Sequence, residues 1–112
     1  MPNSPDTALV ERLRQVLADE PVTETELREL IEQADGLVRA LDAHVSGSEQ
    51  RVAELAQVPD ASLAEIAAEL HRAGTLRPRL DEARGLLADL EARARELRTS
   101  WLLRQTELTL DL

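Results

Sequence analysis

Residues 76–108 read LRPRLDEARGLLADLEARARELRTSWLLRQTEL and decide the fold. Apolar or small side chains recur along them at steps that alternate between four and three residues, up to a break at Arg104. The members of this seam are Leu76, Leu80, Ala83, Leu87, Leu90, Ala94, Leu97, Trp101 and, beyond the break, Leu108. Such heptad spacing predicts one long helix over 76–108, about 50 Å in length. A helix of that length needs another long helix to cover its seam.

A second long helix is predicted over 24–57. Thr23 and Glu26 form a capping-box pattern, and Val22 with Leu27 fits the hydrophobic staple across it. Three adjacent columns follow at seven-residue spacing: Leu27, Ala34, Leu41, Ser48 and Leu55; Ile31, Val38, Val45 and Val52; Leu30, Leu37, His44 and Arg51. A face three columns wide indicates contact with more than one neighbouring helix.

The weakest point of this second helix is Ser46-Gly47-Ser48, because a glycine inside a helix costs about 1 kcal/mol relative to alanine. Ser46 with Glu49 could cap a new helix there. The apolar phase nevertheless continues from Val45 to Val52. We therefore expect one helix with a soft or kinked middle.

Two short helices complete the predicted set, over 5–19 and 62–73. The first would bury Leu9, Leu13, Val16 and Leu17, and the second would bury Leu63, Ile66, Ala67 and Leu70. Gly74 is a natural stop for the second short helix. Thr75 would then cap the long helix 76–108 and place Pro78 in its first turn, where a missing N–H is tolerated.

These elements predict an all-α fold, either a helical bundle or a coiled-coil hairpin of the two long helices, with the short helices completing or capping it. The 112 residues suit one domain over 1–112, with 1–4 and 109–112 as loose tails. Trp101 is the only aromatic residue. The core must therefore consist of Leu, Val, Ile and Ala, which pack well between helices.

The formal net charge of −9 lies entirely in residues 1–75, since 76–112 hold equal numbers of arginines and acidic residues. This balance argues against binding nucleic acid or a membrane surface, because phosphate contacts need a basic surface. All basic residues other than histidine are arginines, which is typical of a GC-rich bacterial genome. The chain has no cysteine, and neither a signal peptide nor an apolar span is visible. We expect a cytoplasmic protein.

No pattern in the sequence predicts a reaction, a metal site or a cofactor. A di-metal bundle site needs a carboxylate one turn from a histidine, and neither His44 nor His71 has one. Neither a G-x-S-x-G nucleophile motif nor a phosphate-binding glycine loop occurs. The sequence therefore predicts that the protein is not an enzyme.

Three groups of residues are candidate sites. His44, Ser48 and Arg51 would form a polar layer at the edge of the bundle, either structural or sensitive to pH and partner. Leu87, Leu90, Leu97 and Trp101 would form an interface along the seam, because tryptophan is enriched at interfaces. Trp101 is alternatively a core anchor near the end of the bundle or a platform for a ligand. Glu24, Glu26, Glu29, Glu32 and Asp35 form an acidic face, which is either a solvated helix surface or a docking surface for a basic partner.

The leading functional hypothesis is a protein–protein interaction module: a small adaptor, scaffold or helical chaperone. A homodimer would supply the helices that one chain lacks, although another protein could fill the same role. One alternative is an acidic inhibitor or nucleic-acid mimic that docks on a basic partner. Another is an enzyme or ligand carrier with an unrecognised pocket.

Overall fold

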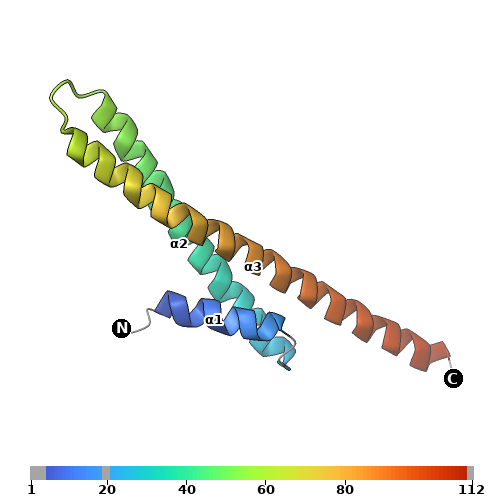
Figure 1. The fold of residues 1–112 in the computed structure, drawn as a ribbon. Helices are drawn as coiled ribbons and strands as arrows, with labels where there is room; N and C mark the ends of the chain where they lie inside the picture. The colour runs from blue at the N-terminus through green and yellow to red at the C-terminus, as the bar shows by residue number, and fades with distance from the viewer. Residues whose placement is uncertain (1–4, 19–20, 111–112) are drawn as a thin grey trace. The chain divides into compact units, whose positions relative to one another are not determined.

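The computed structural model describes residues 5–18 and 21–110, and within these ranges it contains helices and turns but no strand. Helix α1 spans Pro5–Leu17, α2 spans Glu24–Ala56 and α3 spans Leu63–Leu110 (Figure 1). The all-α class is confirmed. Helices α1 and α2 lie close to the predicted 5–19 and 24–57, although position 19 lies outside the described residues. Of the predicted tails 1–4 and 109–112, residues 109 and 110 belong to α3, and the others lie outside the described residues.

Contacts divide the chain into two compact units. Unit 1 comprises Met1–Ala34 and Leu86–Leu112, and unit 2 comprises Asp35–Gly85. Unit 1 therefore holds α1, the first part of α2 and the last part of α3, while unit 2 holds the remainder of α2 and α3. The expectation of a single domain over 1–112 stays a prediction.

Unit 1 is built on a core to which all three helices contribute. Its buried members are Leu13, Val16, Leu27, Leu30, Ala34 and Leu90, with Leu9, Leu17, Val22, Ile31, Leu86, Leu87 and Ala94 packed around them. The predicted apolar face of α1 is confirmed, because all four of its residues belong to this cluster. Three helix faces thus share one aliphatic core.

The start of α2 follows the predicted capping pattern. The backbone N–H of Glu26 donates to Thr23 Oγ1 at 3.1 Å, and the N–H of Leu27 donates to the Thr23 carbonyl at 3.0 Å. Val22 is half-buried and Leu27 is buried, as expected of a hydrophobic staple. These interactions define where α2 enters unit 1.

Unit 2 is an antiparallel pair formed by the later part of α2 and the earlier part of α3, joined by the turn at 57–62 (Figure 1). Leu37, Leu41, Val45, Ala73, Leu80 and Ala83 are its buried apolar residues. Ser62 begins α3 by accepting a hydrogen bond from the Ala64 N–H at 3.1 Å. Helix α2 continues without a break through Gly47, as the apolar phase predicts.

The predicted boundary between helices 62–73 and 76–108 is wrong. Both belong to α3, which continues through Gly74 and carries Pro78 in its interior. Thr75 does not cap a helix: its hydroxyl donates to the His71 carbonyl at 2.9 Å, within the continuous helix. The four-helix count is therefore wrong, as is a hairpin of 24–57 against 76–108, because residues 63–85 are the ones that pair with α2 in unit 2.

The predicted buried face of residues 62–73 is also wrong. Leu63 and Leu70 are exposed, and Ile66 is half-buried. The seam of α3 instead continues backward from Leu80 at the same steps of four and three, through Leu76, Ala73, Glu69 and Ile66, all of which are buried or half-buried. Continuity of the helix thus changes which face of this segment meets α2.

Candidate functional site

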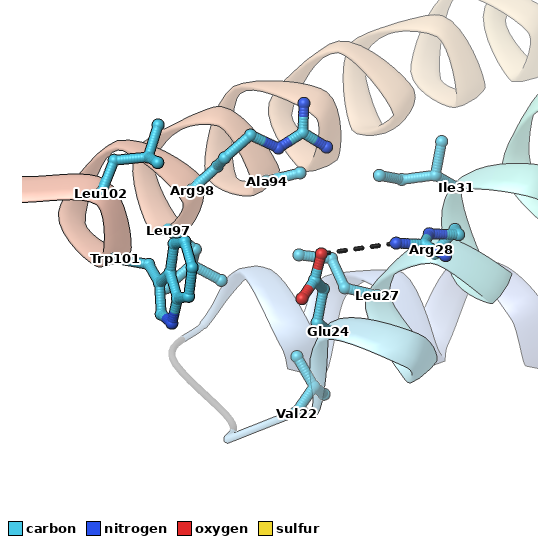
Figure 2. Close-up of a pocket in the computed structure, with 10 residues that line it drawn as sticks. All are labelled: Val22, Glu24, Leu27, Arg28, Ile31, Ala94, Leu97, Arg98, Trp101 and Leu102. Atoms are coloured by element: carbon cyan, nitrogen blue, oxygen red, sulfur yellow. Dashed lines mark hydrogen bonds and ion pairs between the residues drawn. The ribbon is translucent and has the colours of Figure 1, made fainter. Parts of the chain in front are cut away.

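An open groove of about 660 Å³ lies within unit 1, between the start of α2 and the last part of α3. Its lining residues are Val22, Glu24, Leu27, Arg28, Ile31, Ala94, Leu97, Arg98, Trp101 and Leu102. Figure 2 shows Leu97 and Trp101 projecting from α3 toward the start of α2. We call this feature the Trp101 groove.

The lining of the Trp101 groove is mostly apolar. Leu27 is buried, Ile31 and Ala94 are half-buried, and Trp101 remains 59% exposed. The groove therefore presents aliphatic and aromatic surface that the three helices do not cover.

Three charged side chains also line the groove. Glu24 and Arg28 pair with each other at 3.4 Å, one turn apart on α2 (Figure 2). Arg98 comes from α3 and has no ion-pair partner among the residues that the structure describes. An apolar surface with a few charged groups at its edges is suited to binding a protein segment.

Exposed apolar side chains extend beyond the groove along the last part of α3. They are Leu97, Trp101, Leu102, Leu103 and Leu108, each about half exposed or more. Leu97, Trp101 and Leu108 continue the heptad seam, whereas Leu103 lies on another side of the helix. We call these five residues the α3 apolar end.

The structure separates the four predicted interface residues into two groups. Leu90 is fully buried in the core of unit 1, and Leu87 is half-buried against that core. Leu97 and Trp101 are exposed and line the groove. Only the latter pair is accessible to a partner.

The predicted polar layer is brought together, but at the surface of unit 2. Ser48 is buried, whereas His44 and Arg51 are exposed, and all three line one small hollow. Arg51 pairs with Glu69 at 3.0 Å. His44 follows the buried Leu30 and Leu37 in the same column of α2 but is itself exposed. The role of the predicted polar layer stays a prediction.

Glu69 is a buried residue that the sequence reasoning missed. It is 7% exposed, and its Oε1 accepts hydrogen bonds from Arg51 at 3.0 Å and from Arg72 at 3.4 Å. Its Oε2 is buried without a hydrogen-bond partner in the described part of the chain. The seam of α3, extended backward through Gly74, contains the signal that would have located it.

The predicted acidic face lies at the surface of α2, with Asp35 half-buried and the other four residues exposed. Glu24 pairs with Arg28, Asp35 pairs with Arg39 at 2.9 Å, and Glu26 lies 3.9 Å from Arg12. Glu29 and Glu32 make no ion pair within the described ranges. Part of the negative charge is thus balanced by this chain itself.

No group of three or more His, Cys, Asp or Glu side chains within 5–18 and 21–110 is arranged to hold a metal ion. Among the same residues, no helix combines the length and hydropathy needed to cross a membrane. Comparison with protein families, curated proteins and solved structures finds no match to this chain.

Proposed function

We propose that this protein is a non-enzymatic interaction module, of the adaptor, scaffold or helical-chaperone kind, that acts as a homo-oligomer. Its interaction surface is the Trp101 groove together with the α3 apolar end. The observation that carries the proposal is the exposure of Leu97, Trp101, Leu102, Leu103 and Leu108 on one helix segment. Large apolar side chains that stay exposed close together on a folded protein mark interaction sites.

Trp101 is the expected anchor of the interface. It is the only aromatic side chain in the chain, and it lies on the groove at 59% exposure. Tryptophan contributes more binding energy than most side chains, since it buries a large rigid surface at little cost in conformational entropy.

A second copy of the chain is the occupant that the α3 pattern favours. The seam that buries Leu80, Ala83 and Leu90 within one chain continues at Leu97 and Trp101, which the described helices leave about half exposed. The natural partner of a heptad seam is a helix with the same spacing, and two-fold dimers are self-complementary.

The charges of the α3 apolar end are compatible with pairing between copies. Along it, Arg95, Arg98 and Arg104 are interspersed with Glu96 and Glu107. Because both signs occur on one segment, two copies can oppose arginine to glutamate. Such pairs at the rim of an apolar contact set its register more than its affinity.

The test is the mass of the full chain in solution over a dilution series, measured by light scattering. We expect a mass of two chains that falls toward one chain on dilution. Trp101 emission should shift to the red in parallel, because dissociation exposes the indole to water. Leu97→Ser should shift both transitions to higher protein concentration while retaining the fluorophore.

Leu70→Ser is the matched control, since Leu70 is 56% exposed on α3 but belongs to unit 2. It should leave the dissociation curve unchanged. A mass of one chain at every concentration, with constant Trp101 emission, would overturn the homo-oligomer. An equal effect of Leu97→Ser and Leu70→Ser would show that the Trp101 groove is not part of the interface.

The acidic docking alternative has less support, because three of its five carboxylates have arginine neighbours within the chain. It predicts steeply salt-dependent binding of an arginine-rich peptide, which Glu29→Gln with Glu32→Gln would abolish. The Trp101 groove is also compatible with a ligand carrier. If an apolar dye binds the groove and dimer formation displaces it, the groove belongs to the dimer interface and the ligand-carrier alternative is weakened.

A further inference from the structure

A small hollow lies between α2 and α3 within unit 2, separate from the Trp101 groove. It encloses about 150 Å³ and is lined by Ala43, His44, Gly47, Ser48, Arg51 and Arg72. A Cβ atom added at Gly47 would meet no atom within 4 Å, so the space over this residue is open. We call this feature the Arg51–Arg72 hollow.

Glu69 holds the two arginines at the hollow next to each other. One carboxylate oxygen, Oε1, accepts from Arg51 on α2 at 3.0 Å and from Arg72 on α3 at 3.4 Å. Both arginine side chains remain more than half exposed. Because a guanidinium has five N–H donors, most donors of this pair are left for another acceptor.

The hollow has an excess of positive charge. Two carboxylates on this part of α2 pair with α3: Asp42 with Arg84 at 3.1 Å, and Glu49 with Arg77. Glu54, one turn after Arg51, instead accepts a hydrogen bond from Gln50 at 3.3 Å. Within the described part of the chain, Glu69 is the carboxylate that pairs with both Arg51 and Arg72, and one carboxylate balances only one of two guanidinium charges.

Two further polar groups add to the arginines. The imidazole of His44 lines the hollow, and the side chain of Ser48, which is 6% exposed, lines it as well. The Ser48 hydroxyl has no hydrogen-bond partner among the described residues. The lining thus offers hydroxyl, imidazole and guanidinium donors around one small space.

We propose that the Arg51–Arg72 hollow binds a small oxyanion of the phosphate or sulfate class. Planar guanidinium groups bind such anions with two parallel hydrogen bonds, and paired arginines are a recurrent way to recognise them. A water molecule occupies about 30 Å³ in the liquid, so the hollow has room for one tetrahedral oxyanion but not for a nucleotide. The site is independent of the proposed dimer interface.

The overall charge of −9 disfavours unspecific binding of anions to this chain. A chain with this charge repels anions in general, so saturable binding requires local recognition rather than a diffuse basic surface. A free phosphate ion and the phosphate of a modified side chain share the same chemistry here.

The test is a titration of the full ¹⁵N-labelled chain with inorganic phosphate, at ionic strength held constant with sodium chloride. We expect saturable amide shifts centred on Gly47, Ser48 and Arg72. Arg72→Gln should weaken binding about tenfold, the factor that one charge-assisted hydrogen bond provides. Arg79→Gln, which removes the same charge from an exposed position of α3 in the same unit, should retain the affinity.

A second variant separates binding from folding. Gly47→Leu places a side chain in the hollow and improves helix propensity, so it should abolish binding while the helix content is preserved. Gly36→Leu is its control, because Gly36 is also helical and open but does not line the hollow. A parallel titration with N-acetyl-phosphoserine amide that binds more tightly than phosphate would support the site and identify its source as a modified side chain.

Two results would overturn the proposal. One is the absence of saturation, with shifts that chloride reproduces. The other is an equal loss of affinity in Arg72→Gln and Arg79→Gln, which would assign the binding to general surface charge.

Discussion

Pro78 lies four residues after Gly74 inside α3, so the Gly74 carbonyl lacks the backbone N–H that would complete the helical hydrogen bond. The helix continues through both residues because the seam on either side of them, from Ala73 to Leu80, is buried against α2 in unit 2. Tertiary packing therefore outweighs two local signals for a helix end.

Pro78→Ala should stabilise the protein. The substitution restores a hydrogen bond and removes the ring from a helix interior, which is worth about 3 kcal/mol, less up to about 1 kcal/mol for the greater freedom of the unfolded chain. We expect the free energy of unfolding to rise by about 2 kcal/mol in urea denaturation followed by circular dichroism. Pro59→Ala, in the turn before α3, is the control and should not raise it. A loss of stability in Pro78→Ala would show that unit 2 requires a bend there.

Leu90→Ala should destabilise unit 1 strongly. Leu90 is 0% exposed among residues from α1 and α2, so truncation leaves a cavity, and the expected cost is about 2–5 kcal/mol. Leu70→Ala, at 56% exposure on the same helix, should cost less than about 1 kcal/mol. Urea midpoints measure both. Equal losses of stability in the two variants would mean that Leu90 is no more buried than Leu70.

Periodicity in the sequence predicts much of this fold. The columns of α2 and the seam of α3 give the all-α class, the length of α2 and the burial of Leu27, Leu41, Leu80 and Leu90, because aliphatic side chains at helical spacing have one face to bury. Thr23 marks the start of α2, since a side-chain cap is a local interaction that needs no knowledge of the rest of the fold.

The remainder depends on long-range packing that a single sequence does not contain. Gly74 and Pro78 are local helix-ending signals, and only the buried seam around them decides that the helix continues. A helix break at Gly74 would place a different face of residues 62–73 in the core, one that does not include Glu69. The spacing of the seam also does not predict where the helices that cover it end. Leu90 and Trp101 occupy equivalent positions in the heptad pattern, but Leu90 is buried and Trp101 is exposed.

Thr23→Ala should weaken the start of α2. It removes the oxygen that accepts the Glu26 N–H, and loss of such a cap typically costs about 1 kcal/mol. Thr25→Ala, two residues later in the first turn and exposed, removes a hydroxyl without a cap and should change stability by less than about 0.5 kcal/mol. Denaturation monitored by Trp101 emission, which reports on unit 1, measures the difference. Equal losses would exclude a specific role for the Thr23 hydroxyl.

Arg51 and Arg72 should be strongly coupled through Glu69. Each single substitution, Arg51→Met or Arg72→Met, leaves the buried carboxylate with one guanidinium partner, so each loss should be modest. The double substitution leaves a carboxylate that is 7% exposed with no cation, which is costly. A double-mutant cycle in urea should therefore show an excess loss of about 1–3 kcal/mol over the sum of the single losses.

Repeating the double-mutant cycle in a Glu69→Leu chain tests whether Glu69 causes the coupling. Without the carboxylate, neither arginine has a buried charge to neutralise, and the coupling between Arg51→Met and Arg72→Met should disappear. The Glu69→Leu chain should also tolerate the double substitution better than the chain with glutamate, since an apolar residue can replace a buried ion pair at little cost. Additive losses in the glutamate chain would contradict the shared-carboxylate arrangement. Coupling that persists with leucine at this position would assign it to direct contact between the arginine side chains instead.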